Sequence, residues 1–225
     1  MKKVDFDDYT DDYAKLLENQ LCFFDENTDY FAMHKASLVH RLIRHSPNSI
    51  LEFGCGVGTN IRHLAIAFPD AAVYGCDVSK KSLEVAAQKN PTAEFFSPNS
   101  NPTVYKGRFD LVFIANVFHH ITPGQRLETL HRVRQLMSDH GELFIFEHNP
   151  YNPVTRHIVK SCPFDADAQL LKPKELVSLL SQAEFSIIQK HFILFFPSFL
   201  SRLRTLERYL VRVPLGGQYV IHAAL

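Results

Sequence analysis

The sequence carries no excess of charge of either sign. Its 24 lysines and arginines balance 24 aspartates and glutamates among 225 residues. Proteins that bind duplex nucleic acid usually rely on several cationic contacts to phosphate, and a strongly charged surface partner would require a complementary field. The composition therefore predicts no nucleic-acid partner.

Long apolar runs are also missing. No uninterrupted apolar stretch approaches the roughly 20 residues that a membrane-spanning helix needs. The first residues, 1–8, turn acidic where a signal peptide would become apolar. We therefore expect a cytoplasmic protein, and the hydrophobic content of 46% is ordinary for a globular domain.

The cysteines form no recognisable pattern. Cys22, Cys55, Cys76 and Cys162 are widely separated, and no two of them form a Cys-x-x-Cys pair. A zinc site or a disulfide framework is thus not expected, and the thiols are predicted to be free and buried. We predict no metal. Internal repeats and low-complexity linkers are absent too, so the chain can form one domain.

A glycine-rich segment is the most informative feature that is present. An apolar run, 50–53, suits a buried strand, and a helical pattern follows from position 59. Between them stand Gly54, Gly56 and Gly58, which let the backbone approach a ligand at the free N–H groups of the next helix. This arrangement predicts a loop that binds a nucleotide-like cofactor.

Two details of this segment disfavour NAD. A dinucleotide fingerprint needs glycine at position 59, where this chain has Thr59. Glu52 also lies two positions before the first glycine, where it could receive a cationic group. A nicotinamide-dependent oxidoreductase is therefore a remote alternative.

Residues 52–58 resemble the first motif of class I S-adenosylmethionine-dependent methyltransferases. Three further segments agree in order. Residues 73–79 read as a second strand that ends at Asp77, residues 109–121 resemble the family's fourth strand and the loop after it, and residues 141–147 resemble its fifth strand. The resemblance covers roughly residues 45–195.

The resemblance implies an α/β fold: a Rossmann-like, doubly wound, seven-stranded sheet, mostly parallel with an antiparallel last strand, and helices on both faces. We expect a single domain over 1–225. Within it, 1–45 would form a helical cap, 46–196 the cofactor-binding core, 148–172 a substrate-side loop, and 197–225 an extra helix and the final strand at the sheet edge.

Local patterns place the elements of this fold. Apolar spacing predicts helical structure over 6–21 and around 38–43. Ser79 is predicted to cap a helix in which Leu83 and Ala87 face inward. Further helices are expected over 59–68, from 122 to about 137, from 172 onward, and over 197–213. Further strands are expected over 93–96, 185–196 and 218–225.

The resemblance implies S-adenosylmethionine as cofactor, and S-adenosylhomocysteine as product. The three glycines would make room for its amino-acid portion. Asp77 would hold the ribose and Val78 would pack on the adenine. Glu52 would support the amino group, directly or through water, and Asn116 would meet the methionine moiety. Asp77 acting only as a helix cap, or Asn116 only ordering its own loop, are the alternatives left open. Asn99 is a weaker candidate for the adenine amine.

The acceptor is expected to be a small molecule or a lipid-like metabolite, with oxygen slightly favoured. Residues 148–153 superficially resemble the motif of adenine and glutamine amino-methyltransferases. That motif follows the fourth strand, whereas this loop follows the fifth, so neither substrate is expected. If the acceptor is a hydroxyl, a histidine is the natural base, and His148, then His120, then His157 are the candidates. Tyr151 is expected to orient the acceptor or to fill the loop.

Two residue patterns have more than one interpretation. His119 and His120 are adjacent, so on a regular element they would not both point at one site. The predicted helix over 197–213 places leucines on one face and arginines on its flank, which suits either a helix docked on the sheet or peripheral contact with a membrane. A non-catalytic S-adenosylmethionine-binding sensor or partner subunit, and a membrane-surface interaction protein, are the alternatives to an enzyme.

Overall fold

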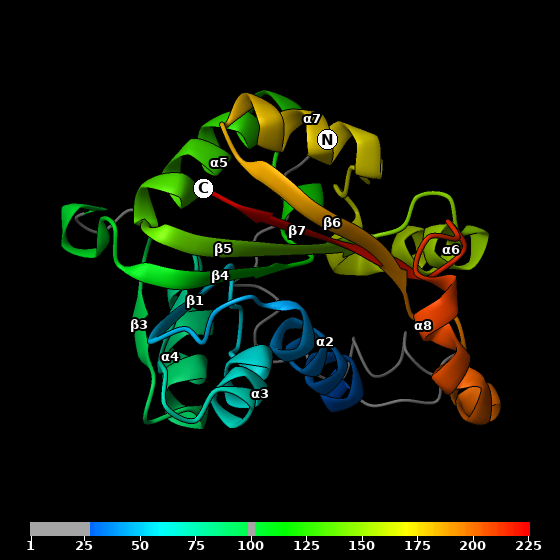
Figure 1. Ribbon diagram of the computed structural model, residues 1–225, viewed down its shortest axis with the longest axis horizontal. Coiled ribbons are helices and arrows are strands. Elements are labelled where there is room, and N and C mark those ends of the chain that lie inside the picture. The colour runs from blue at the N-terminus through cyan, green and yellow to red at the C-terminus, as the bar shows by residue number, and fades with distance from the viewer. Residues whose placement is uncertain (1–27, 99–101) are drawn as a thin grey trace.

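The computed structural model describes residues 28–98 and 102–225 (Figure 1). The pattern predicted over 6–21, together with Cys22 and Asn99, lies outside these residues. Cys55, Cys76 and Cys162 are buried, as expected.

A seven-stranded sheet forms the centre of the protein, with the order β3-β2-β1-β4-β5-β7-β6. The strands are β1 Ser49–Phe53, β2 Ala72–Cys76, β3 Glu94–Phe96, β4 Phe109–Ala115, β5 Met137–His148, β6 Ser186–Ile193 and β7 Gln218–Ala224. The pairs within β3-β2-β1-β4-β5 are parallel, whereas β7 runs antiparallel to both of its neighbours. The predicted fold class is confirmed.

The final strand does not lie at the sheet edge, where it was expected. Val220 pairs with Phe146 of β5 on one side and with His191 of β6 on the other, so β7 is interior and β6 is the edge. Burial explains this order. Every residue of β7 is buried, whereas most of β6 is partly or fully exposed. An edge position would have left one side of the apolar strand without a hydrogen-bonded neighbour.

Helices cover both faces of the sheet (Figure 1). On one face lie α2 Thr28–Leu42, α3 Thr59–Ala67 and α4 Lys80–Lys89, and on the other lie α5 Pro123–Leu136 and α7 Pro173–Gln182. Beyond the carboxyl ends of β5 and β6 lie α6 Pro153–Ser161 and α8 Glu207–Leu210. Short 3₁₀ turns complete the chain: η2 Pro102–Tyr105, η3 Phe118–His120, η4 Pro163–Asp165 and η5 Ser198–Leu206.

Each face of the sheet has its own apolar core. Adjacent strand residues point to opposite faces, so Leu111 packs in the core beneath α2 and α3, while Val112 packs in the core beneath α5 and α7. Both residues are fully buried. Because both faces are covered, the central strands read as nearly continuous apolar runs rather than as alternating ones.

The predicted N-cap of α4 is present, but the buried face of this helix is shifted by one residue from the predicted one. The Ser79 hydroxyl accepts a hydrogen bond from the Ser82 N–H at 3.1 Å, as predicted. Ala86 is fully buried, whereas Ala87 is exposed and Leu83 only partly buried. The prediction placed Ala87 inward, and the structure corrects this.

Residues 197–213 do not form the continuous helix that was predicted. The segment is divided into η5 and α8, with non-helical torsions at Leu200 (φ −109°, ψ 20°), and neither element has a buried residue. It is attached through polar groups instead. Glu207 accepts hydrogen bonds from the N–H groups of residues 194, 195 and 196, and Arg204 donates to the Phe196 carbonyl. These attachments to the end of β6 fix the segment without a leucine stripe against the sheet.

Among the helices in residues 28–98 and 102–225, none combines the length and the apolar content needed to cross a bilayer.

Candidate functional site

The glycine-rich loop connects β1 to α3 through left-handed backbone conformations. Gly54, Gly56 and Gly58 have φ values of 77°, 50° and 77°. The N–H groups of Gly54 and Cys55 both donate to the carbonyl of Cys76, at 2.8 and 3.0 Å. The loop is therefore tied to the end of β2, and each of its glycines adopts torsions that other residues rarely tolerate.

The surroundings of the three glycines differ. A Cβ atom at Gly54 would stand 2.4 Å from a Val117 methyl group, and one at Gly58 would stand 2.6 Å from the Asn90 amide. A Cβ atom at Gly56 would meet nothing within 4 Å. Two glycines thus allow close packing inside the protein, while the third leaves open space beside the loop.

Asp77 follows β2 directly and binds this loop. Its carboxylate accepts the Gly56 N–H at 2.8 Å and the Ser79 N–H at 2.9 Å. A carboxylate at this position can also accept a hydrogen bond from a ligand hydroxyl. Val78, the next residue, is 66% exposed and is accessible to a ligand ring.

Glu52 is buried at the end of β1 with one oxygen satisfied. Asn60 donates to Glu52 Oε1 at 2.6 Å, whereas Oε2 has no hydrogen-bond partner within the described residues. Burial raises the pKa of Glu52 to about 8, against the opposing effects of the Asn60 hydrogen bond and the Lys35 charge. Lys35 on α2 is also buried, which lowers its pKa to about 8.

Asn116 lies just beyond β4, the neighbour of β1. Its φ is 58°, and its N–H donates to the Phe146 carbonyl at 2.9 Å. Its side-chain oxygen Oδ1 is buried and, within the described residues, without a hydrogen-bond partner. Two neighbouring strands therefore each present one buried oxygen that can accept a hydrogen bond, next to the glycine loop.

These features fit S-adenosylmethionine. The two unpartnered oxygens suit its cationic amino group, because a buried acceptor without a donor is costly until a ligand supplies one. The open space at Gly56, the position of Asp77 beside the loop and the exposed Val78 suit the rest of the molecule.

A second group of side chains surrounds η3, the turn after β4. Glu147, a fully buried residue of β5, accepts the N–H groups of Val117 and Phe118 at its Oε1, at 3.0 and 2.7 Å. Its Oε2 lies 2.6 Å from His119 Nδ1. Burial alone would raise the pKa of Glu147, but the charge and hydrogen bond of His119 outweigh burial and lower it.

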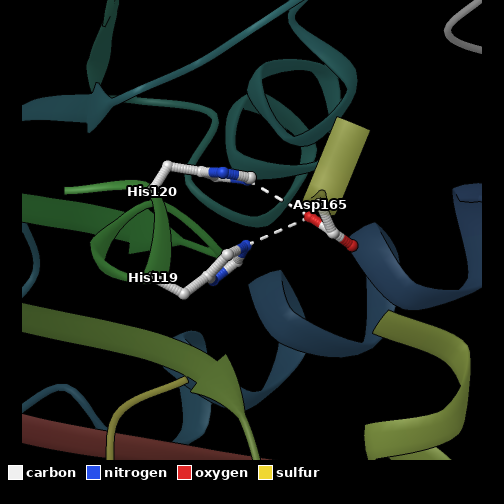
Figure 2. Close-up of side chains that lie close together, drawn as sticks. All are labelled: His119, His120 and Asp165. Carbon is white, nitrogen blue, oxygen red and sulfur yellow. Dashed lines mark ion pairs between the residues drawn. The ribbon is translucent and has the colours of Figure 1, made fainter. Parts of the chain in front are cut away.

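His119 and His120 point to the same carboxylate, contrary to prediction. His119 Nε2 and His120 Nε2 lie 3.4 and 3.3 Å from Asp165 Oδ1 in η4 (Figure 2). The two rings are 4.1 Å apart at a 49° angle. The prediction assumed a regular element, whereas these residues occupy a short 3₁₀ turn that lets neighbouring rings converge. His120 Nδ1 also lies 3.3 Å from Asp167 Oδ1.

The charges of this cluster depend on one another. Burial would lower the pKa of His119, but Glu147 and Asp165 raise it to about 10. The hydrogen bonds and positive charge that Asp165 receives from the histidines hold its pKa below the usual range, despite its burial. His119 is therefore a cation that lies between two carboxylates.

His148, the first-choice base, lies beside this cluster at the end of β5. Its ring centroid is 5.0 Å from that of His119. Burial, followed by the His119 charge, lowers its pKa to about 4, so its imidazole is neutral at pH 7. Tyr151 lies beyond it in the loop before α6, 45% exposed, with its N–H bound to the Asn149 side chain. His148 thus lies beside the cluster to which His120 belongs, whereas Tyr151 lies in the loop that follows β5.

The connection after α6 is fixed over this cluster by Arg126 of α5. Arg126, which is buried, donates to the carbonyls of Ile121 and Gln169 and to the Glu175 carboxylate. The Gln169 N–H in turn donates to the His119 carbonyl at 2.7 Å. These bonds place Asp165 and Asp167 above η3.

Sequence reasoning missed three residues of this region. Glu147 was assigned only to a strand, and neither Lys35 nor Asp165 was placed in this site. Charged residues within otherwise apolar segments were the available signal for Glu147 and Lys35, because such residues are rarely buried without a partner. Nothing in the sequence showed that residues 119 and 165 meet.

Comparison with known proteins agrees with this geometry. Residues 51–143 match the family model of a methyltransferase domain. The chain is 34% identical to a probable thiol methyltransferase of Arabidopsis thaliana over 96 residues, covering 40% of this chain and 42% of that protein. It is 26% identical to a demethylmenaquinone methyltransferase of Thermotoga maritima over 148 residues, covering 65% and 61%. The chain thus spans about two fifths and three fifths of these two curated relatives.

A solved structure shows the same fold over nearly the whole chain. The S-adenosylmethionine-dependent methyltransferase of Archaeoglobus fulgidus superimposes with a TM-score of 0.71 at 15% identity, covering 95% of this chain and all of that one. The likeness over the whole chain shows the fold of these enzymes, and residues 51–143 are similar to a methyltransferase domain. The predicted resemblance is confirmed.

Proposed function

We propose that the protein transfers a methyl group from S-adenosylmethionine to a small-molecule or lipid-like acceptor, with oxygen the slightly favoured acceptor atom. The observation that carries this proposal is a pair of buried oxygens beside the glycine loop, Glu52 Oε2 and Asn116 Oδ1, which have no hydrogen-bond partner among residues 28–98 and 102–225. A purely structural loop would have no need to leave two buried acceptors without donors.

The residues of the cofactor end have distinct roles in this proposal. Glu52 and Asn116 bind the amino-acid portion, Asp77 binds the ribose, and Val78 covers the adenine. Gly54, Gly56 and Gly58 keep the loop close to the ligand. The cofactor itself supplies an electrophilic methyl group on a sulfonium with a neutral leaving group, so the protein mainly aligns the acceptor and excludes water.

The acceptor is proposed to bind beyond the carboxyl ends of β4 and β5, where open α/β sheets form their ligand crevice. The loop and helix of residues 148–172 border this region, His148 serves as base, and Tyr151 orients the acceptor. The named relatives act on different acceptor types, including a thiol and demethylmenaquinone, so their names do not decide the acceptor atom. No nucleic acid is involved in this proposal.

The decisive first experiment is calorimetric titration with S-adenosylmethionine, S-adenosylhomocysteine and NAD. We expect the first two to bind, NAD not to bind, and Asp77→Ala to weaken binding. Incubation with labelled S-adenosylmethionine and pools of hydroxyl, amine and thiol metabolites then identifies the acceptor class. Absence of binding of either sulfonium-derived ligand would refute the cofactor assignment. Binding without turnover of any acceptor would instead favour a sensor or partner subunit.

The role of His148 is tested by His148→Ala once an acceptor is known. A general base contributes about 10² to 10⁴ in rate, so turnover should fall by that factor while affinity for S-adenosylmethionine is retained. A loss smaller than about tenfold would assign His148 a structural role. His120→Ala tests the second candidate in the same assay.

The exposed apolar side chains of η5 and α8 favour a second function, contact with an anionic lipid surface. Phe199 and Tyr209 are 74% and 69% exposed, and Leu206 is 46% exposed. Arg202 and Arg208 are exposed on the same segment. Apolar groups beside cations suit an anionic membrane interface, where each basic residue contributes about 1 kcal/mol.

Vesicle co-sedimentation tests this second proposal. We expect binding to phosphatidylcholine vesicles only when phosphatidylserine is included, and loss of binding in Arg202→Glu/Arg208→Glu. Arg204 is unsuitable for this variant because it donates to the Phe196 carbonyl and lies 4.3 Å from the Tyr30 ring. Equal sedimentation of the parent and the charge-reversed variant would exclude an electrostatic surface contact.

A further inference from the structure

Three side chains at the carboxyl end of the sheet direct one ligand atom each toward a common point. His119 and His120 come from η3, and Asp165 comes from η4, 45 residues further along the chain. Their ligating atoms all lie within 4.8 Å of one another. Figure 2 shows the two rings approaching the same carboxylate from adjacent positions of one turn.

The other nitrogen of each ring is held by a carboxylate. His119 Nδ1 lies 2.6 Å from Glu147 Oε2, and His120 Nδ1 lies 3.3 Å from Asp167 Oδ1. Histidines that bind metals characteristically donate their second ring N–H to a carboxylate, which fixes the tautomer and leaves the opposite nitrogen for the ion. Both rings have this arrangement, with Nε2 on the side of Asp165.

The distances suit a small divalent ion. In tetrahedral zinc sites the bonds to nitrogen and oxygen are about 2.0–2.1 Å, which separates neighbouring ligand atoms by about 3.3 Å. The observed separations from Asp165 Oδ1 to His119 Nε2 and His120 Nε2 are 3.4 and 3.3 Å. Two of the three separations between ligand atoms therefore match a tetrahedral site, and the third pair of atoms lies within 4.8 Å.

The surrounding structure holds these three side chains in place and leaves part of the cluster exposed to solvent. Glu147 accepts the N–H groups of Val117 and Phe118 at the start of η3, and Arg126 binds the Gln169 carbonyl beyond η4. The His119 side chain is buried, whereas those of His120 and Asp165 are 15% and 10% exposed. The polar cluster is thus preorganised, with its accessible side at His120 and Asp165.

We propose that His119 Nε2, His120 Nε2 and Asp165 Oδ1 bind a divalent transition-metal ion of the zinc type. Imidazole and carboxylate ligands suit such ions, and a set of three protein ligands leaves further coordination positions open. The site lies where β4 and β5 end, beside the region assigned to the acceptor. It goes beyond the proposed function, and it differs from the sequence-based expectation of no metal, which considered only the cysteines.

The metal-free cluster could instead be a set of ion pairs that fixes the connection after α6. In that case the carboxylates of Glu147, Asp165 and Asp167 bind the two histidines without an ion. The two roles differ in a measurable way. Only a metal site binds one equivalent of ion per chain, and only there does substitution of a ligand residue weaken the binding of that ion.

The test uses the full chain, stripped with a chelator and dialysed, and titrated calorimetrically with Zn²⁺. Co²⁺ serves as the spectroscopic probe, since its visible absorption reports the coordination geometry. We expect about one equivalent of either ion per chain. His120→Ala and Asp165→Ala should weaken binding at least tenfold, and Asp167→Asn, which removes the support of one ring, should weaken it by about 10- to 100-fold.

His131→Ala and Asp139→Asn are the matched controls, because both residues are exposed and lie outside the cluster. They should bind the ions as the parent does. Titration of every variant with S-adenosylmethionine shows that the fold is intact and keeps metal binding separate from the cofactor proposal. The metal proposal is overturned if the parent takes up neither ion, or if His120→Ala and Asp165→Ala bind Zn²⁺ as tightly as the parent.

Discussion

At the scale of single residues, two side-chain oxygens lie where the amino group of the cofactor is proposed to bind. Glu52 Oε2 and Asn116 Oδ1 are buried without hydrogen-bond partners in the part of the chain that the structure describes, at the ends of neighbouring strands. An unpartnered buried acceptor costs about 1–3 kcal/mol, which a ligand donor can recover. Hydrogen bonds from the amino group of the cofactor to these two oxygens would thus contribute to its binding free energy, in addition to contacts with the rest of the cofactor.

Glu52 should couple cofactor binding to proton release. Burial raises its pKa to about 8, so its carboxyl is mainly protonated at pH 7 in the free protein. A cationic amino group at Oε2 favours the carboxylate and lowers this pKa. Binding therefore releases a proton, and affinity should rise with pH between about 6 and 7.5, by at most tenfold per pH unit. Above this window the cofactor's own amino group begins to lose its proton.

Calorimetry in buffers of different ionisation enthalpy measures the released proton. Glu52→Gln is the control, because an amide of the same shape does not titrate, and its affinity should be nearly independent of pH over this window. Equal proton release by the parent and by Glu52→Gln would assign the linkage to another group.

Gly54→Ala should destabilise the protein more than Gly56→Ala does. Both alanines incur about 1–2 kcal/mol for left-handed torsions. At position 54 the added Cβ would also stand 2.4 Å from a Val117 methyl group, whereas at position 56 it meets nothing within 4 Å. Overpacking adds about 1–3 kcal/mol.

Denaturant unfolding of the two variants without cofactor measures this difference. Gly54→Ala/Val117→Ala should recover part of the loss, because the second substitution removes the clashing methyl groups. An equal loss of stability for the two single variants would show that the Val117 contact costs nothing.

Sequence reasoning was accurate for residues within one motif and failed for residues that meet across the fold. The glycine turn after β1 and the Ser79 cap were predicted correctly because both depend on neighbours within a few positions. His119 and His120 were expected to point in different directions because a regular element was assumed. The periodicity of apolar residues does not distinguish a 3₁₀ turn from the end of a strand. The roles of Lys35 and Glu147 depend on α2 and β5 packing beside β1 and β4, which no local pattern encodes.

At the scale of elements, one buried arginine attaches the α6–α7 connection to α5. Arg126 makes three hydrogen bonds, to Ile121, Gln169 and Glu175. Asp165 and Asp167 lie in the same connection and face the histidines of η3. The position of the proposed metal and acceptor region therefore depends on a residue outside it.

Arg126→Met should lower the free energy of unfolding by on the order of 2–4 kcal/mol, because it leaves several acceptors without their charged donor. Glu175→Gln is the matched control. Its side chain is 46% exposed, so loss of that one ion pair should cost less than about 1 kcal/mol. Hydrogen exchange should also accelerate at the Gln169 amide in Arg126→Met. Unchanged protection there would show that other contacts hold the connection.

The C-terminal elements show where periodicity misleads. Leucines at positions 200, 203, 206 and 210 predicted one continuous helix with an apolar face, and docking of that face on the sheet was one of two interpretations. Leu203 and Leu206 are instead 38% and 46% exposed. The segment is anchored by Glu207, whose carboxylate accepts three backbone N–H groups after β6. The pattern contained the amphipathic spacing, but it could not specify whether the apolar side would face the sheet or solvent.

At the scale of the whole molecule, strand order brings separate segments to one edge of the sheet. The glycine loop follows β1, Asp77 follows β2, Asn116 follows β4 and His148 ends β5. The four motifs predicted these neighbours because parallel strands with helical crossovers place their carboxyl ends together. The position of β7 between β5 and β6 was not predicted, because an antiparallel strand is compatible with either edge until burial decides.

This arrangement predicts that the cofactor stabilises the entire domain. The proposed ligand contacts lie on loops that are bonded to one another, since Gly56 donates to Asp77 and Asn116 donates to Phe146 of β5. A ligand at 100 times its dissociation constant adds about 2.7 kcal/mol to the free energy of unfolding. For a chain of this size, each kcal/mol raises Tm by about 2–4 °C.

Thermal unfolding with saturating S-adenosylhomocysteine should therefore raise Tm by about 5–10 °C, whereas NAD should leave it unchanged. In Asp77→Ala the same ligand concentration should produce a smaller shift, because the ribose contact is lost while the fold is retained. Hydrogen exchange with bound ligand should show slower exchange at the ends of β1, β2 and β4 together. If protection were confined to the glycine loop, the ligand would engage that loop alone, and the proposed contacts from β2 and β4 would be wrong.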